Sequence, residues 1–209
     1  MLTETNTSLV YKLVDKQTIS SGTIDHRSTI AKRKFPIDLS YISIPKRSAF
    51  VYLISKTVNK SPLHFLQGRG WIYRDKNFLG TVWMNQTIPG QEIKLSLGAD
   101  KNIKVERRSI RKELGEKIKF HKKDRLHYVY EIQLENLKKT QILLTLKDQL
   151  PFSYHEDIEI KTKAISPIPK KVDEKNIITW EINLKPNEKK TVQLDYQVEY
   201  PTGKSIKGL

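Results

Sequence analysis

The chain has 209 residues and no cysteine, and its 38 lysine and arginine residues against 23 aspartate and glutamate residues give a formal net charge of +15. The lack of cysteine excludes a disulfide framework, a thiolate metal site and a cysteine nucleophile. No stretch approaches the roughly 18 apolar residues that span a bilayer, and residues 1–10 lack the basic and apolar regions of a signal peptide, so we expect a protein that is soluble as given.

The amino-terminal half reads as short strands separated by turn residues. The expected strands cover residues 8–14, 18–24, 34–38, 41–44, 50–58, 70–74, 78–84, 92–97 and 103–107. Asp75, Lys76 and Asn77 tolerate tight turns, so we expect a hairpin between the strands at 70–74 and 78–84. Together these segments predict a β-sandwich unit over residues 1–108.

The character of the chain changes between residues 104 and 125, where ten basic residues stand against four acidic ones. We interpret residues 109–125 as a basic hairpin or loop that joins two long strand ends, with charges that keep the edge from pairing with other chains. A helix over residues 109–119 is the weaker alternative, because Gly115 interrupts the i, i+4 spacing of its apolar residues.

The carboxy-terminal half alternates apolar and polar residues with the period of two that is typical of half-buried strands. Its expected strands cover residues 126–136, 140–149, 156–164, 176–183 and 190–199. The positions expected to face a core are Tyr128, Tyr130, Ile132, Leu134, Ile178, Trp180, Ile182, Leu184, Val192, Leu194, Tyr196, Val198 and Tyr200. The loop over residues 165–171 holds two prolines and cannot be a central strand. Residues 185–188 form a tight turn that should bring Trp180 near the inward residues of the next strand.

Five strands at this spacing suit an immunoglobulin-like unit over residues 126–209. We therefore predict an all-β protein with an antiparallel β-sandwich architecture, made of two packed β units with the immunoglobulin-like one at the carboxy end. Whether the two units share one sheet or core stays open at this point.

No pattern for catalysis, for a cofactor or for a metal ion emerges, so the chain is not expected to be an enzyme. The five histidines lack metal-ligand spacing, a Gly-x-Ser-x-Gly nucleophile motif does not occur, and Gly68-Arg69-Gly70 is too short for a phosphate-binding loop. His155-Glu156-Asp157 is the one cluster that combines imidazole and carboxylates, but Glu156 and Asp157 would point to opposite faces of a strand. A hydrolase with a cleft between the two β units, near His155 and Glu156, is kept as an alternative.

The positive charge indicates an anionic partner in general terms and says nothing about specificity. An acidic polysaccharide or another polyanion could bind the basic stretch, whereas nucleic acid is not expected. The residues that would carry such binding are Arg107, Arg108, Arg111, Lys112, Lys122, Lys123 and Arg125. The simpler interpretation is a solvated, solubilising surface.

Three aromatic residues, Trp71, Tyr73 and Trp83, fall on the expected hairpin. Aromatic residues on a sandwich hairpin are more often part of the core, and that is the expected placement. If they face water, they would form a glycan-stacking platform, and Arg69 and Arg74 beside them would suit an anionic glycan.

Several short motifs occur in an order that resembles the carboxy-terminal domain of mucoidy inhibitor A-like proteins, a mostly bacterial group whose domain is of unknown function. The residues that carry the resemblance are Ile44-Pro45-Lys46 before Val58-Asn59, Phe78-Leu79-Gly80 before Pro89-Gly90, Leu97-Gly98-Ala99-Asp100 with Ile103-Lys104-Val105, Asp148-Gln149-Leu150-Pro151 with Glu156-Asp157-Ile158, and the ending Tyr200-Pro201-Thr202-Gly203.

This resemblance implies a non-catalytic interaction module, the end piece of a multidomain bacterial protein. Its partner would be the other domains of its own parent chain or a separate protein. The family provides no catalytic residue to transfer, and the compartment stays open, with the cell envelope or periplasm as the candidate place for the parent protein.

Overall fold

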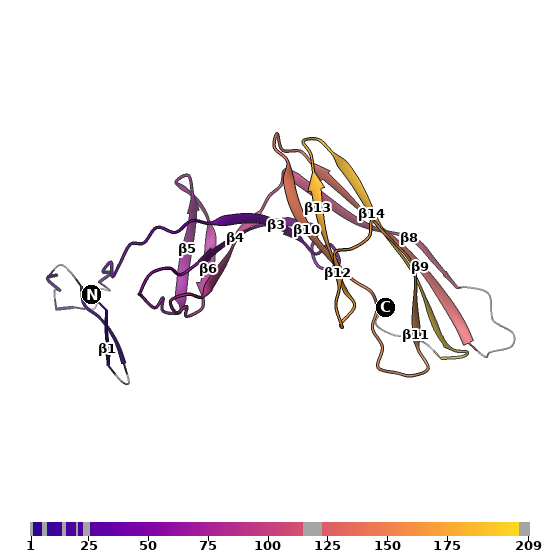
Figure 1. Cartoon of the computed structure of the whole chain (residues 1–209), viewed down its shortest axis with the longest axis horizontal. Helices are drawn as coiled ribbons and strands as arrows, with labels where there is room; N and C mark the ends of the chain where they lie inside the picture. The colour runs from indigo at the N-terminus through magenta and orange to yellow at the C-terminus, as the bar shows by residue number, and fades with distance from the viewer. Residues whose placement is uncertain are drawn as a thin grey trace.

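The computed structural model describes residues 2–5, 8–13, 16–19, 21–22, 26–114 and 123–204, and this part of the chain is all-β, without a helix. Figure 1 shows an elongated molecule whose amino terminus and carboxy-terminal strands lie far apart. The strands are β1 (Leu2–Thr5), β2 (Ser8–Tyr11), β3 (Asp38–Ser43), β4 (Val51–Val58), β5 (Gly68–Arg74), β6 (Asn77–Met84), β7 (Glu92–Ala99), β8 (Ile103–Leu114), β9 (Lys123–Asn136), β10 (Ile142–Gln149), β11 (Glu159–Ser166), β12 (Lys171–Val172), β13 (Ile177–Leu184) and β14 (Lys189–Pro201).

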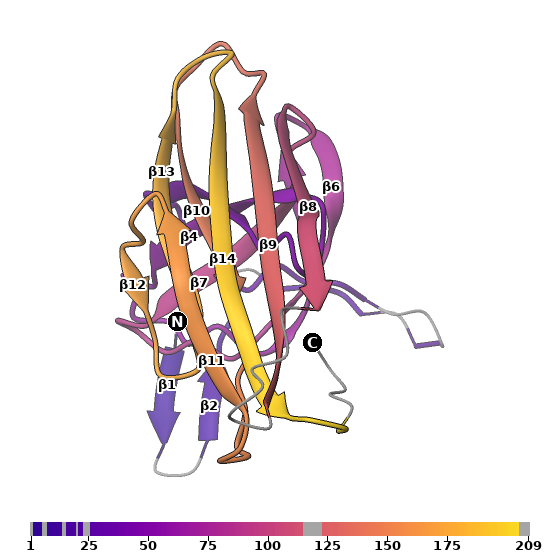
Figure 2. The ribbon, with the colours of Figure 1, turned by 90° about the vertical axis from the view of Figure 1, so that its right-hand side faces the viewer.

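Two sheets pack face to face and form the main body. One has six strands in the order β12-β13-β10-β3-β4-β7, and the other has four in the order β11-β14-β9-β8. In Figure 2 the long β9 and β14 run through the centre of the four-stranded sheet, with β10 and β13 behind them. The predicted antiparallel β-sandwich architecture is therefore confirmed, with the exception of one parallel strand pair described below.

The core between the sheets consists of the inward positions of the alternating strands. Ile132 and Leu134 of β9 face Leu144 and Leu146 of β10, and all four are essentially without exposed surface. Every position that the alternation placed inward in the carboxy-terminal half is buried, except for the partly buried Tyr130. Apolar burial of this kind stabilises a sheet by about 25 cal/mol for each Å² removed from water.

The turn over residues 185–188 connects the two sheets instead of closing a hairpin within one. Strand β13 pairs with β10 in the six-stranded sheet, whereas β14 pairs with β9 in the four-stranded sheet. Trp180 of β13 therefore meets the inward residues of β14 across the core, and its indole N–H donates to the Pro167 carbonyl at 2.9 Å.

Asn136 holds together two connections between the sheets, the one from β9 to β10 and the one from β13 to β14. It has no exposed surface, and its side-chain amide N–H groups donate to the carbonyls of Thr140, Leu184 and Lys185 at 3.0–3.1 Å, while its carbonyl oxygen accepts from the Lys138 amide. One buried side chain thereby satisfies backbone groups of two connections that leave the same end of the sandwich.

The division into units at 1–108 and 126–209, joined by 109–125, does not match the way the strands pair. Strand β3 pairs in parallel with β10, through Tyr41 with Leu144, so strands from both predicted units share the six-stranded sheet. The boundary at residue 108 falls inside β8, which pairs with β9 as far as Leu114, with a register shift between Ser109 and Arg111. Residues 109–114 and 123–125 are strand ends, as interpreted above, and not a helix; residues 115–122 lie outside the described part.

The predicted hairpin between β5 and β6 is confirmed, and it forms a two-stranded sheet of its own. Asp75 and Lys76 both have positive φ, 49° and 69°, which is the backbone of a tight two-residue turn that suits the twist of the strands. In Figure 1 this hairpin stands between the amino terminus and the sandwich. The expected strands at 18–24 and 34–38 are not seen in their described residues before Asp38, while β1 and β12 were not predicted.

Candidate functional site

One face of the β5–β6 hairpin carries most of its large side chains. Directly opposite residues of an antiparallel pair point to the same face, and the register pairs Arg69 with Trp83, Trp71 with Thr81 and Tyr73 with Phe78. We call the surface formed by Arg69, Trp71, Tyr73, Phe78 and Trp83 the aromatic face. It holds four aromatic rings and one positive charge within two strands.

The aromatic face is open to solvent, so the expectation that these residues belong to the core was wrong. Trp71, Tyr73 and Trp83 keep 50%, 64% and 65% of their surface exposed, and Phe78 is exposed too. The alternation of residues along the two strands predicted that the three aromatic residues share one face of the hairpin. It could not predict whether that face packs against the rest of the protein or lies in water. The half-buried side of the hairpin holds smaller residues, among them Val82.

Contacts within and around the aromatic face order the rings without covering them. The Tyr73 and Phe78 ring centroids lie 5.6 Å apart in a tilted arrangement. The guanidinium of Arg27 lies 5.3 Å from the Trp71 ring centroid, a distance that suits a cation–π interaction. A second cation, in addition to Arg69, therefore borders the face.

Three of the seven residues predicted to bind a polyanion belong to the four-stranded sheet and pair with carboxylates. Arg107 points into the sandwich and pairs with Asp148, Arg108 pairs with Glu106 at 2.6 Å, and Arg125 pairs with Glu199 at 2.7 Å.

The other members of that predicted set do not converge on one place. Arg111 is exposed, Lys112 lies in β8 opposite Tyr128, and Lys123 begins β9. Lys122 lies outside the described residues.

The outer face of the four-stranded sheet is balanced in charge. Glu135 lies between Lys104, at 3.8 Å, and Lys189, at 3.3 Å, and His127 Nε2 lies 2.7 Å from Asp195 Oδ1. In the described part of this face, charges of opposite sign lie side by side across strands and form no continuous positive track for a long anion.

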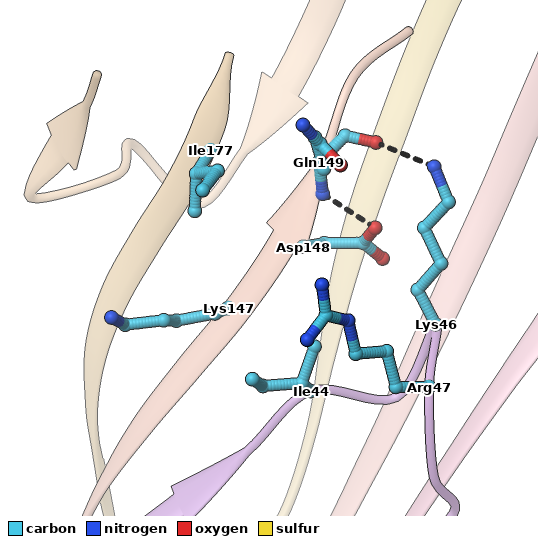
Figure 3. A pocket seen from close by; sticks show the side chains of 7 residues that line it. All are labelled: Ile44, Lys46, Arg47, Lys147, Asp148, Gln149 and Ile177. Atoms are coloured by element: carbon cyan, nitrogen blue, oxygen red, sulfur yellow. Dashed lines mark hydrogen bonds between the residues drawn. The ribbon is translucent and has the colours of Figure 1, made fainter. Parts of the chain in front are cut away.

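A pocket of about 180 Å³ lies where β3 and β10 end side by side, and we call it the strand-end pocket. Its lining residues are Ile44, Lys46, Arg47, Lys147, Asp148, Gln149 and Ile177. Two of the sequence motifs that carry the family resemblance, Ile44-Pro45-Lys46 and Asp148-Gln149-Leu150-Pro151, meet here although the chain separates them widely. Figure 3 shows Lys46 rising to Gln149 and the Arg47 guanidinium beneath Asp148.

Asp148 joins the strand-end pocket to the core of the sandwich. Its carboxylate accepts from Arg107 Nε at 2.7 Å and from the Gln149 amide at 2.7 Å, and its side chain has no exposed surface. The Arg107 guanidinium in turn lies 3.7 Å from the Tyr130 ring centroid. Asp148 is therefore a structural carboxylate whose oxygens are occupied by donors of its own chain.

Three stacked tyrosines continue from Arg107 along the inner face of β9 and β14. The rings of Tyr128, Tyr130 and Tyr196 lie 5.3–6.3 Å apart. Burial, together with the neighbouring Tyr130, raises the pKa of Tyr196 far above its ordinary value. The Tyr196 hydroxyl therefore stays protonated near neutral pH and does not serve as a base.

The cluster at His155 does not form a site within the described part of the chain. His155 and Asp157 are more than half exposed on the loop before β11, and His155 Nδ1 accepts from the Asp157 amide at 3.2 Å. Among the described residues, no group of three or more histidine and carboxylate side chains is placed to hold a metal ion.

Sequence reasoning missed the cations of the strand-end pocket, Lys46, Arg47 and Lys147. The only signal was that Ile44-Pro45-Lys46 and Asp148-Gln149 belong to the motifs that carry the family resemblance. A short sequence motif does not indicate which other motif it contacts in the fold, because the parallel pairing of β3 with β10 is not visible in either segment.

Comparison with known proteins assigns the chain to a family. Residues 3–202 match the model of the family described as Domain of unknown function (DUF4139), so the chain belongs to this family. The part of the resemblance that concerned a domain of unknown function is thereby confirmed.

A curated relative carries the same kind of sequence within a longer protein. Protein F37C4.5 of Caenorhabditis elegans is 25% identical over 203 residues, which cover 91% of this chain and 36% of the relative. The chain thus spans about a third of the length of this relative. No solved structure matches, and no helix among the described residues is both long and apolar enough to cross a membrane.

Proposed function

We propose that this chain is a non-catalytic interaction module of a mucoidy inhibitor A-like protein, and that it docks through the aromatic face of the β5–β6 hairpin. The observation that carries the proposal is the set of four exposed aromatic side chains on one face of a two-stranded sheet. The immunoglobulin-like character of the carboxy-terminal half and the bacterial, envelope-associated nature of the parent protein remain predictions within this proposal.

The energetic argument rests on the cost of leaving such a surface in water. Burying one large apolar side chain is worth about 1.5–3 kcal/mol, and aromatic residues dominate the binding energy of protein interfaces. Trp71, Tyr73, Phe78 and Trp83 lie together, whereas single exposed apolar residues are common and need no partner. A face of this composition fits an interface better than a free surface.

The occupant that we propose is another segment of the same polypeptide. The curated relative extends well beyond the matched region, since the match covers 36% of its length. Arg69 and Arg27 at the border of the face would add charge complementarity to an apolar segment that carries acidic flanks. The sandwich would then serve as the rigid base that holds the hairpin toward its neighbour.

The test compares two pairs of exposed aromatic residues. The remainder of the polypeptide encoded by the gene is expressed as a separate chain, and its binding is measured by calorimetry. We expect Trp71→Ala/Trp83→Ala to weaken binding more than a hundredfold, because each hot-spot residue contributes about 2 kcal/mol or more. The control Phe152→Ala/Tyr154→Ala removes an exposed ring pair from another loop and should change nothing.

Three results would refute the proposal. The first is equal weakening by the two variants, and the second is a gene that encodes no further segment. The third is turnover of a glycan, ester or peptide that disappears in a His155→Ala variant, which would contradict the non-catalytic assignment and favour the hydrolase alternative.

A glycan-stacking function is the second candidate, favoured by the exposure of Trp71, Tyr73 and Trp83 beside Arg69. Sugar rings stack on exposed aromatic faces, and a cation beside them would select an acidic sugar. Tryptophan fluorescence during titration with uronic acid oligosaccharides distinguishes this candidate: saturable changes that are lost in Trp71→Ala/Trp83→Ala would favour it over the protein interface. The basic stretch at 107–125 is not proposed for this role, since three of its arginines pair with carboxylates.

A further inference from the structure

We propose that the strand-end pocket is a carboxylate-binding site that takes one glutamate or aspartate side chain of a partner protein. This inference concerns a surface other than the aromatic face and does not depend on what covers that face. The sequence placed the candidate binding cations between Arg107 and Arg125, whereas in the described part of the chain three cations without an ion pair line the strand-end pocket.

Three cations line the strand-end pocket, and their charges are not neutralised within the described part of the chain. Arg47 and Lys147 form no ion pair there, and Lys46 makes one long hydrogen bond, 3.5 Å, to the Gln149 carbonyl. In Figure 3 the Arg47 guanidinium lies between Ile44 and Asp148, with Lys46 on one side and Lys147 on the other. This arrangement contrasts with the outer face of the four-stranded sheet, where cations and carboxylates alternate.

Among the described residues, the one carboxylate of the strand-end pocket pairs with Arg107 and forms no ion pair with these three cations. Asp148 already accepts from Arg107 Nε and from the Gln149 amide, one bond to each of its oxygens. Its charge is shared with Arg107, a residue that faces the core and is only 17% exposed. The pocket therefore keeps a net positive charge that an incoming anion would neutralise.

The backbone places these cations where two neighbouring strands end, one of them in β10 and the other two in the turn after β3. Lys147 and Gln149 belong to β10, and Ile44 follows directly after β3, its parallel neighbour. Arg47 is positioned by the turn after β3, where the Arg47 amide donates to the Ile44 carbonyl at 2.8 Å. A guanidinium presents a planar fork that matches a carboxylate with two parallel hydrogen bonds.

The size and the walls of the pocket favour a single acidic side chain over a chain of acidic sugars. A volume of about 180 Å³ holds one side chain, and Ile44 and Ile177 offer apolar contact to its aliphatic stem. A polyuronate would need cations repeated along a groove, whereas the neighbouring four-stranded sheet is balanced in charge. A peptide segment with one glutamate or aspartate fits this geometry.

The test is an amide NMR titration of the whole chain with the tripeptide acetyl-Ala-Glu-Ala-amide. We expect saturable shifts at Ile44, Arg47 and Gln149 at millimolar peptide, and none with the isosteric acetyl-Ala-Gln-Ala-amide. Arg47→Ala should weaken binding by about tenfold, the effect of one charge-assisted contact. Lys147→Ala should weaken it less, because Lys147 lies on the other face of β10 from Asp148. The matched control is Lys139→Ala, which removes an exposed lysine from the loop before β10.

Further probes separate the sources of the carboxylate and the two proposals. One probe is acetyl-Ala-Ala-Ala, which has a free carboxy end and no acidic side chain. If it bound more tightly than the glutamate peptide, the pocket would be a site for a chain terminus, and the proposed occupant would be wrong. A uronic acid hexasaccharide that bound the same residues more tightly than either peptide would also overturn it. Trp71→Ala/Trp83→Ala should leave the titration unchanged, so failure here is distinguishable from failure of the aromatic-face proposal.

Two outcomes would show that the strand-end pocket is not a carboxylate-binding site. One is an equal response to the glutamate and glutamine peptides, and the other is binding that Arg47→Ala and Lys139→Ala weaken to the same degree. Thermal unfolding first shows that each variant is folded. The Arg47→Lys variant is a second test, because it keeps the positive charge but removes the planar guanidinium that can form two parallel hydrogen bonds.

Discussion

The ion pair between Arg107 and Asp148 connects the two sheets, and its removal should show how strongly the sandwich depends on it. Arg107 belongs to β8 of the four-stranded sheet and Asp148 to β10 of the six-stranded sheet, with 2.7 Å between Nε and Oδ2. The Asp148 side chain has no exposed surface and that of Arg107 has 17%. Either partner left alone would be a charge in a poorly hydrated place.

We expect Arg107→Met to destabilise the protein by about 3–5 kcal/mol, because it leaves the Asp148 carboxylate buried without a counter-charge. For a chain of this length that corresponds to a decrease of about 6–20 °C in melting temperature. Asp148→Asn keeps an acceptor for the Gln149 amide and should cost less. The double variant should be far more stable than the sum predicts, since buried pairs can often be replaced by neutral groups at little cost.

The measurement is urea unfolding of all four proteins, followed by far-ultraviolet circular dichroism and analysed as a double-mutant cycle. A coupling free energy of about 2 kcal/mol or more is expected for groups in direct contact. The expectation would be refuted if the losses in unfolding free energy of the two single variants simply added up in the double variant. It would also be refuted if Arg107→Met stayed within about 0.5 kcal/mol of the parent, since an ion pair of that strength behaves like a solvent-exposed one.

Three further predictions concern the rest of the sandwich. Lys161 donates a hydrogen bond that lowers the pKa of Glu199 below its ordinary 4.5, so this carboxylate stabilises the fold above that pH and ceases to do so as the pH falls through the lowered pKa. Thermal melts should show Glu199→Gln to be destabilised near pH 7, with a difference from the parent that shrinks as the pH is lowered through the lowered pKa. A difference that stays constant with pH would contradict this. Asn136→Ala should cost about 3 kcal/mol in urea unfolding, because buried carbonyls lose their donor, and a loss under about 1 kcal/mol would argue that water replaces it. Trp180→Phe should cost about 1–2 kcal/mol by the same assay, since the Pro167 carbonyl loses its indole donor, and an unchanged midpoint would show that this bond contributes nothing.

The strands of the carboxy-terminal half could be predicted because each has one face in the core and one in water. The alternation around Ile132 in β9 and around Trp180 in β13 is a direct consequence of that environment, and both residues are buried as expected. Pairing partners could not be predicted in the same way. The parallel contact between β3 and β10 depends on a match between distant segments that leaves no mark within either of them.

For the candidate sites, the sequence indicated which residues to consider but not whether their side chains are exposed or paired. The residues of the aromatic face were identified from their shared strand, but their exposure depends on the absence of a covering layer over a hairpin that stands apart from the sandwich. The basic stretch was visible as composition, whereas the neutralisation of Arg125 by Glu199 depends on strand register. Charge counted along the chain is therefore a poor guide to charge that is free to bind.

The parallel pairing of β3 with β10 also sets the order in which the protein can be completed during synthesis. Tyr41 of β3 meets Leu144 of β10, so the central strand of the six-stranded sheet leaves the ribosome about a hundred residues before its neighbour. At about 5–20 residues per second, β3 and β4 wait on the order of 5–20 s with one sheet edge open. During this interval the nascent amino-terminal half exposes the strand edge that β10 later covers, and an open edge of this kind can pair with other chains. A chain that ends before β10 lacks the neighbour that covers this edge of β3.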